Sequence, residues 1–252
     1  MHFLPADPAA DVAWKLVATN LSDLAAKGAL VEGILLNYPL SDTAWDTAFL
    51  AGLAEVLAAY DTPLIGGDTV TLPPAGPRIL TVTAIGRDAA APPRSNARAG
   101  DRLWVTGTIG DAGAGLAIAR RGGDSPAALI DAYRRPRPRL AEGRALAQHV
   151  HAMMDVSDGL LIDAARMAAA SGLAVAIDLA TVPLSPDFPD DALTAATAGD
   201  DYELLFAAPA GWTPPVAATA VGVFATGTGL TLTRGTTPIP LPPSLGFEHR
   251  RD

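Results

Sequence analysis

The chain has 252 residues, of which 49% are hydrophobic and 18% charged, and its formal net charge is −9. This charge argues against a nucleic-acid or anionic-membrane partner, because both need clustered positive charge. The absence of cysteine excludes disulfides, thiol nucleophiles and cysteine-ligated metals. No apolar run of about 18 residues is present, and the start does not resemble a signal peptide. We therefore expect a globular protein located in the cytoplasm.

The first part of the chain alternates helical and strand patterns. Residues 11–28 combine a capping aspartate, helical spacing and a closing glycine, which predicts a helix. The elements expected after it are a strand at 33–40, a helix at 44–61, a strand at 62–71, a hairpin tip at 72–78 and a strand at 79–87. This order is typical of an α/β layer.

A domain boundary is expected where the periodicity is lost, in residues 88–100, which are rich in proline, arginine and small residues. A second unit then begins with a strand, a glycine-rich turn and a helix at 101–122. Residues 153–172 predict a further strand followed by a helix of small residues. The sequence thus favours an α/β (α+β) fold with domains at 1–97 and 98–252.

Six aspartates interrupt apolar surroundings at the ends of elements or on apolar helix faces. They are Asp23, Asp68, Asp155, Asp158, Asp200 and Asp201. A buried carboxylate is costly unless it is hydrogen-bonded, ion-paired or bound to a metal. Carboxylates that hold Mg²⁺ together with phosphates are a common arrangement in acidic proteins. The pattern therefore predicts one convergent site for a phosphorylated ligand.

Five of these acids also have a purely structural interpretation, whereas Asp155, inside an apolar strand, is harder to explain in this way. Asp23 lies four residues before Lys27, which is the spacing of a helical ion pair. Asp68 fits an Asx turn after a strand, and Asp158 fits a helix cap. The acids of residues 200–203 fit the loop that leads into a strand.

Glycine-rich segments at 64–69 and 107–116 allow close approach of the backbone to a ligand. Neither contains the lysine of a phosphate-binding P-loop, and the protein-kinase motifs are not found. An ATP user of this kind would depend on metals and arginines. Arg94, between the two domains, is a candidate phosphate contact, with a solvated linker position as the alternative.

Five motifs occur in the order and approximate spacing of one enzyme family. They are NLSDLAAKGA (20–29), LIGGDT (64–69), MDVSDGLLID (154–163), GDDYELLF (199–206) and GFEH (246–249). The chain resembles the thiamine-monophosphate kinases, whose superfamily also contains aminoimidazole ribonucleotide synthetase and selenophosphate synthetase. The resemblance implies a two-domain fold of the aminoimidazole ribonucleotide synthetase type, with an N-terminal domain that binds ATP and metal. It also implies dimerisation through the N-terminal sheets.

The resemblance further implies transfer of the γ-phosphoryl group of ATP to thiamine monophosphate, with several Mg²⁺ ions and without a protein base. By motif position, the metal ligands would be Asp23, Asp68, Asp155 and Asp158. The ATP contacts would be Gly67, Asp68, Arg94 and Ser157. The contacts to thiamine monophosphate would be His2, Asp200 and Phe247, with Phe247 stacked on a thiamine ring.

Family members carry a further stretch ahead of the segment that begins here with HFLP (2–5). It includes a glycine-aspartate-aspartate motif. The expectation is therefore an N-terminal domain that lacks its first strands. Two alternatives follow: a binder of nucleotide or thiamine phosphate without catalysis, and another ATP-dependent enzyme of the superfamily such as aminoimidazole ribonucleotide synthetase.

Overall fold

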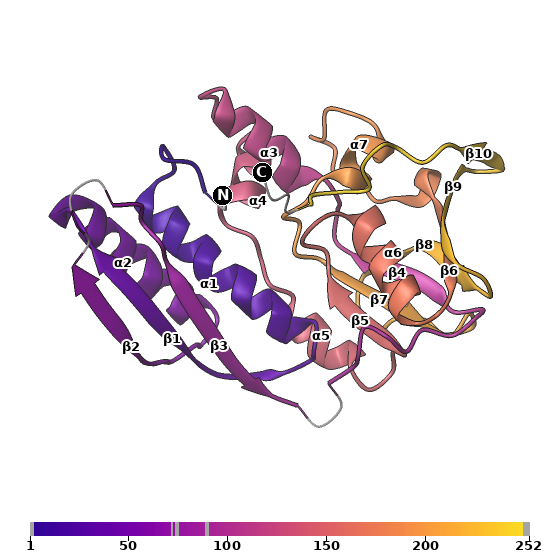
Figure 1. Ribbon diagram of the computed structural model, residues 1–252, viewed down its shortest axis with the longest axis horizontal. Helices are drawn as coiled ribbons and strands as arrows, with labels where there is room; N and C mark the ends of the chain where they lie inside the picture. Colours follow the sequence, from indigo (N-terminus) through magenta and orange to yellow (C-terminus); the bar gives the residue numbers. More distant parts are fainter. Residues whose placement is uncertain (1–2, 72, 74–75, 89–90, 249–252) are drawn as a thin grey trace.

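The computed structural model describes residues 3–71, 73, 76–88 and 91–248. Its elements form two α/β layers that lie side by side (Figure 1). The first layer contains α1 (Ala9–Ala25), β1 (Leu30–Leu40), α2 (Thr43–Ala59), β2 (Leu64–Thr71) and β3 (Thr81–Arg87). The second begins with β4 (Arg102–Thr106), α3 (Asp111–Arg120), α4 (Ala127–Arg134), α5 (Leu140–Leu146), β5 (Ala152–Asp155) and α6 (Leu160–Ala170). It continues with β6 (Ala174–Asp178), the 3-10 turn η1 (Leu179–Thr181), α7 (Ala192–Thr197), β7 (Leu204–Ala208), β8 (Ala218–Ala225), β9 (Gly229–Arg234) and β10 (Thr237–Ile239).

The strands of the first layer form a three-stranded sheet with the order β2-β1-β3. Strand β1 is parallel to β2 and antiparallel to β3. The expected hairpin between the strands now seen as β2 and β3 is therefore wrong, because β1 lies between them. The apolar runs of all three strands are real, but the strand pairing depends on tertiary contacts that the local pattern does not contain.

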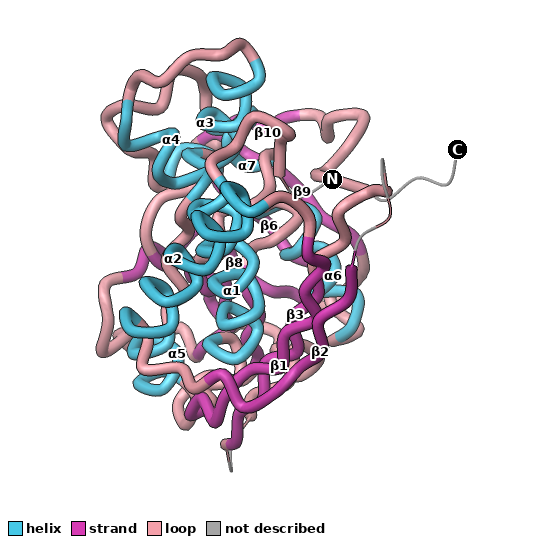
Figure 2. Tube along the Cα trace, turned by 90° about the vertical axis from the view of Figure 1, so that its left-hand side faces the viewer, coloured by secondary structure: helices cyan, strands magenta, loops and turns pink. Residues whose placement is uncertain are grey.

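Helices α1 and α2 lie on one side of this sheet (Figure 2). Side chains alternate across a strand, so the buried Ile34, Leu36 and Tyr38 of β1 face the helices. The intervening Leu35 and Asn37 are exposed and project from the opposite face. The small sheet therefore has one covered face and one exposed face.

The strands of the second layer form a seven-stranded sheet with the order β10-β9-β6-β8-β4-β7-β5. Strand β7 is buried on both faces: Leu205 belongs to the core that contains α6, and Phe206 belongs to the core that contains α1. Full burial of a side chain such as Phe206 contributes roughly 2–3 kcal/mol relative to exposure. Helix α1 is thereby packed between the small sheet and the large one, beside β5 and α5.

The connection between the layers runs from Arg87, the end of β3, to Arg102, the start of β4. The boundary predicted between residues 97 and 98 falls in this segment. No helix in the described part of the chain is long and apolar enough to cross a membrane. The packing of α1 against the large sheet brings the end of α1 and the end of β5 together.

Candidate active site

Asp155 is the last residue of β5, the edge strand of the large sheet. Its side chain is buried, and its Oδ2 accepts a hydrogen bond from Ser22 Oγ of α1 at 2.7 Å. Burial raises the pKa of this carboxyl to about 6, and the nearby Asp23 adds to the shift. A buried acid beside a second acid is a group that a bound cation would stabilise.

Asp23 follows Ser22 on α1 and lies close enough to two basic side chains to be affected by their charge. Desolvation raises the pKa of Asp23, whereas Arg94 and Lys27 lower it. Burial and Arg94 lower the pKa of Lys27, and Asp155 and Asp23 oppose this shift. The Lys27 ammonium donates a hydrogen bond to Pro92 O at 3.0 Å, which ties α1 to the segment between the layers. Two acids and two bases from three separate segments therefore converge here.

The donor set fits Mg²⁺, because Asp23 and Asp155 provide the hard oxygen atoms that this ion prefers. Proteins usually hold Mg²⁺ with one or two carboxylates together with substrate phosphates rather than in an all-protein cage. Over the residues that the structure describes, no group of three or more acids and histidines is placed to hold a metal ion. The Asp23 and Asp155 pair thus fits an ion whose coordination is completed by phosphate oxygens.

The turn at 156–159 joins β5 to α6 and carries two of the predicted residues, Ser157 and Asp158. The Asp158 carboxylate pairs with Arg166 Nη1. The carbonyl of Ser157 accepts a hydrogen bond from Asp200 N–H at 2.8 Å, and the carbonyl of Asp158 accepts one from Phe247 N–H at 2.8 Å. Three motifs that lie far apart in the sequence are therefore connected through the main chain of one turn.

Asp200 connects the two layers through an ion pair that sequence reasoning missed. Its Oδ2 accepts a hydrogen bond from Lys15 Nζ of α1 at 2.7 Å, and its Oδ1 accepts one from Tyr202 Oη at 3.1 Å. Lys15 is buried, and its ammonium lies 4.1 Å from the ring centroid of Tyr133. The only available signal was that Lys15 is one of two lysines in the chain.

The backbone around Asp200 is strained, because Asp200 and Tyr202 have φ values of 71° and 53° in the left-handed region. The surrounding structure fixes this conformation: Asp200 N–H bonds to Ser157 O, and Tyr202 N–H bonds to Val156 O at 2.8 Å. Strained residues persist only when their surroundings hold them, and they concentrate at functional sites. The strain therefore favours a functional role for Asp200.

A groove of about 690 Å³ opens beside this ion pair, between the N-terminal segment, α1 and the start of β3. Its lining is largely apolar, with a few polar groups, and includes Phe3, Lys15, Asn20, Trp45, Arg78 and Leu80. This size and character suit a small organic molecule. Lys15 thus lies at the junction of the groove and Asp200.

Gly67 and Asp68 are not brought to the Asp23 and Asp155 cluster. Asp68 lies on β2 opposite Asn37 of β1, and both positions project from the face of the small sheet that is turned away from α1. Asp68 Oδ1 accepts a hydrogen bond from the N–H of the next residue, Thr69, at 2.9 Å. Gly67 is required by packing, since an added Cβ would lie 1.9 Å from Leu36 O. The ATP and metal roles of these two residues stay predictions.

The remaining predicted residues are Arg94, Phe247 and His2, which lie in separate parts of the chain. Arg94 is exposed and acts on Asp23 and Lys27 electrostatically. Phe247 is 51% exposed, next to the turn at 156–159. His2 lies outside the residues that the structure describes.

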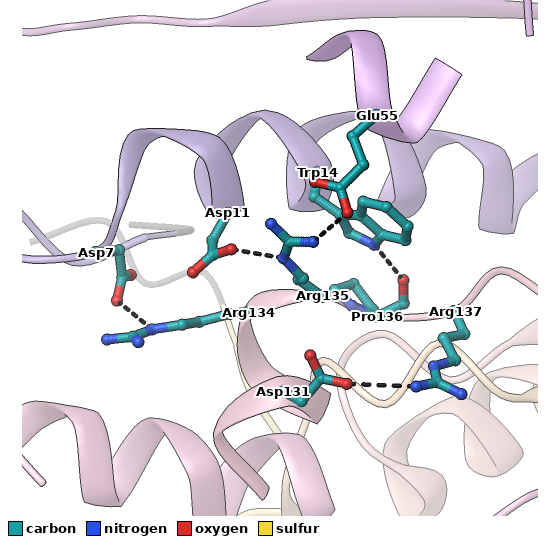
Figure 3. A network of polar contacts seen from close by, with 9 residues as sticks. All are labelled: Asp7, Asp11, Trp14, Glu55, Asp131, Arg134, Arg135, Pro136 and Arg137. Atoms are coloured by element: carbon teal, nitrogen blue, oxygen red, sulfur yellow. Dashed lines mark hydrogen bonds and ion pairs between the residues drawn. The ribbon is translucent and has the colours of Figure 1, made fainter. Parts of the chain in front are cut away.

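An arginine-rich segment at 134–139 joins α4 to α5 in the second layer, and its side chains reach α1 and α2 of the first layer, as Figure 3 shows. Arg135 Nε lies 2.6 Å from Asp11 Oδ1, and Arg135 Nη1 lies 2.7 Å from Glu55 Oε1. Arg134 Nε lies 3.3 Å from Asp7 Oδ1. These contacts help to fix α1 and α2 against the second layer.

Two family profiles match the chain: the N-terminal domain of the AIR synthase related proteins over residues 1–87 and their C-terminal domain over residues 98–212. The thiamine-monophosphate kinase of Caulobacter vibrioides is 42% identical over 245 residues, which cover 88% of this chain and 68% of that protein. The crystal structure of thiamine-monophosphate kinase from Stenotrophomonas maltophilia K279a is 36% identical with a TM-score of 0.84, covering 92% of this chain and 81% of that one. The structure of AaThiL complexed with AMPPCP and TMP is 29% identical with a TM-score of 0.84, covering 94% and 82%.

Fold and site together define a two-domain α/β protein of the AIR synthase related class. Both the resemblance seen in the sequence and the expected fold class are confirmed. The chain belongs to the thiamine-monophosphate kinase family.

Proposed function

We propose that this chain transfers the γ-phosphoryl group of ATP to thiamine monophosphate, giving thiamine diphosphate and ADP. A phosphate oxygen of the acceptor attacks the γ-phosphorus, and the bond between the γ-phosphorus and the β–γ bridging oxygen breaks. Family membership supports this reaction, as does a structural relative at 29% identity that was solved with AMPPCP, an ATP analogue, and TMP. The observation that carries the proposal is the convergence of Asp23, Asp155, Arg94 and Lys27 between the two layers.

Asp23 and Asp155 would hold Mg²⁺, which supplies neutralisation of the negative charge on the phosphoryl groups. Arg94 extends that neutralisation from the segment between the layers, and Ser157 offers a hydroxyl from the turn after β5. Phosphoryl transfer depends mainly on in-line positioning and charge stabilisation. Since the acceptor phosphate oxygen is already a nucleophile, the scheme requires no protein base.

The acceptor side is assigned to Asp200, Phe247 and His2. Of these residues, Asp200 is linked to the groove through Lys15, which lines it, and the size and apolar lining of the groove suit an aromatic substrate. Half-exposed Phe247 would offer a ring face for stacking on thiamine. The main-chain bonds from Asp200 and Phe247 to the turn at 156–159 would keep the acceptor residues in a fixed relation to the ATP side.

The direct test is incubation of the purified chain with ATP, Mg²⁺ and thiamine monophosphate, followed by chromatographic separation of the thiamine phosphates. Thiamine diphosphate should form in equal amount to ADP, and Asp155→Asn should remove this activity. Binding of both substrates by calorimetry without any product would instead indicate a binder without catalysis. Turnover of a ribonucleotide amide in place of thiamine monophosphate would indicate another superfamily reaction.

We also propose that the chain forms a homodimer through the exposed face of its small sheet. This face carries the exposed apolar side chains Leu35 and Val70, which are 38% and 55% exposed. Contiguous exposed apolar surface on a sheet favours association with another surface. A dimer of this kind would place Asp68 at the interface rather than in the cluster of Asp23 and Asp155.

A further inference from the structure

Asp163 is a buried carboxylate to which neither the sequence motifs nor the proposed reaction assigns a role. It lies in the first turn of α6, and its side chain is fully buried, with 0% exposure. Its Oδ2 accepts hydrogen bonds from three successive backbone N–H groups, those of Ser157 at 3.1 Å, Asp158 at 3.0 Å and Gly159 at 3.2 Å. A single anionic oxygen is thus enclosed by the turn that follows β5.

These bonds provide an acceptor for the backbone N–H groups of the turn that leads into α6. Three consecutive N–H groups that lost their acceptor would each carry a desolvation cost, of about 1–3 kcal/mol when buried. Gly159 has φ 129°, a conformation that L side chains rarely adopt, and an added Cβ would lie 3.0 Å from Ala198 O. The turn therefore has a conformation that favours glycine at position 159, and its hydrogen bonds to Asp163 hold it in that conformation.

The second carboxylate oxygen of Asp163 fixes the side chain of Arg166. Oδ1 accepts a hydrogen bond from Arg166 Nη1 at 2.8 Å, and the same nitrogen also contacts the Asp158 carboxylate. The orientation of the Asp158 side chain is therefore coupled to Asp163 through Arg166.

The carbonyl groups of the same turn point to the acceptor side. Ser157 O receives the N–H of Asp200, and Asp158 O receives the N–H of Phe247. The N–H groups of the turn thus bind Asp163, while its carbonyls bind the main chain of two residues assigned to thiamine monophosphate. A shift of this turn would move the ATP side and the acceptor side together.

We propose that Asp163 is a positioning residue for phosphoryl transfer, which holds the turn at 157–159 so that Ser157, Asp158, Asp200 and Phe247 keep their mutual arrangement. This inference rests on the proposed function. Misplacement of reacting groups by about 1 Å can cost about 100-fold in rate. Asp163 itself touches neither substrate in this scheme and acts only through the turn.

The test uses Asp163→Asn, which keeps the side-chain shape but removes the charge and replaces one acceptor oxygen by a donor. We expect kcat/KM to fall by about 10- to 100-fold, with KM raised for both ATP and thiamine monophosphate. Loss of folded protein alone would lower kcat and leave both KM values unchanged. Hydrogen–deuterium exchange of the amides at 157–159 should become at least about tenfold faster, because their acceptor is weakened.

Asp101→Asn is the matched control. Asp101 is also a buried aspartate of the second layer, and its Oδ2 accepts the Arg98 N–H at 2.8 Å and pairs with His151. This variant should lose stability and leave both kcat/KM and the exchange at 157–159 within about twofold of wild type. A folded Asp163→Asn protein that behaves like this control would overturn the proposal.

Arg166→Gln decides the matter if Asp163→Asn does not fold. Arg166 is 41% exposed, so its replacement leaves the core intact. The variant should lose some stability, because the buried Asp163 carboxylate loses its cation, but it should stay folded by circular dichroism. We expect a loss in kcat/KM of about threefold or more, and wild-type kinetics would overturn the proposal. The exchange measurement needs no turnover. An inactive wild-type chain would therefore refute the proposed function, and exchange that is unchanged in Asp163→Asn would separately refute the role of Asp163.

Discussion

Replacing Asp155 by asparagine should stabilise the metal-free protein at neutral pH while removing its activity. Burial raises the pKa of this carboxyl from its ordinary value of 3.8 to about 6. At about 1.4 kcal/mol per pKa unit, the charged form costs the folded state about 3 kcal/mol. The natural residue therefore retains a destabilising charge, which is expected of a group that serves a cation rather than the fold.

The sign of the pH dependence follows from linkage. Because the pKa is higher in the folded state than in the unfolded state, the folded state binds the extra proton between about pH 4 and pH 6. The wild-type free energy of unfolding should therefore fall by about 3 kcal/mol from this group as pH rises through that window. Asp155→Asn lacks this term, so its advantage over wild type should grow with pH.

The assay is urea unfolding followed by circular dichroism, in chelator, at several values between about pH 4 and pH 8. Asp191→Asn provides a control of opposite sign. Asp191 accepts hydrogen bonds from Leu193 N–H and Thr194 N–H, and the Thr194 bond is the main reason that its pKa is lowered. That variant should be less stable at neutral pH, with a deficit that shrinks in acid. A stability difference between Asp155→Asn and wild type that does not change with pH would show that the pKa of Asp155 is not raised by folding.

Three further predictions concern binding and assembly. Lys15→Met breaks the ion pair with Asp200 and leaves the half-buried Asp200 carboxylate without its cation; it should lower the free energy of unfolding by about 1.5–3 kcal/mol in urea titrations and raise KM for thiamine monophosphate. Wild-type values for both would count against a role for the pair. Phe247→Ala should raise KM for thiamine monophosphate by about 2- to 10-fold in steady-state kinetics, through loss of stacking, and leave KM for ATP unchanged. An equal change for both substrates would contradict the assignment. Val70→Lys should convert the proposed dimer to a monomer in sedimentation velocity, whereas Leu50→Lys, an exposed position on α2, should not; a dimer that persists in both variants would place the interface elsewhere.

Local patterns in the sequence predicted most of the elements that position the site. The helix expected at 11–28 is α1, and the strand expected at 62–71 contains β2. Both signals are local, because helical spacing and an apolar run between turns depend on neighbouring residues. The aspartate cap expected for the helix is wrong: α1 begins at Ala9 with Pro8 at its N-cap, and Asp11 lies inside the first turn. The motif resemblance added the fold class, which the comparisons confirm.

The strand order and the direction of Asp68 could not be predicted in this way. Both depend on β1 lying between β2 and β3, with a register shift between Ile34 and Leu35. A shift of one residue moves every later side chain to the other face of a strand. The prediction that Asp68 joins Asp23 and Asp155 in one cluster therefore finds no support within a single chain.

Tertiary partners of charged residues were equally inaccessible. Lys15 and Asp200 are 185 positions apart, and each has an ordinary local interpretation. From its sequence neighbours alone, Asp163 is an acid near the start of a helix. Its contact with three backbone donors depends on the conformation of the turn. Only the packing of α1 and α6 against the large sheet reveals these roles.

Phosphorus NMR of a reaction that contains ATP, Mg²⁺ and thiamine monophosphate follows the transferred phosphoryl group itself. We expect the γ-phosphoryl signal of ATP to be replaced by the terminal phosphate signal of thiamine diphosphate, in step with ADP, and we expect Asp23→Asn and Asp155→Asn both to abolish this change. Accumulation of inorganic phosphate without thiamine diphosphate, or undiminished transfer in both variants, would contradict this expectation.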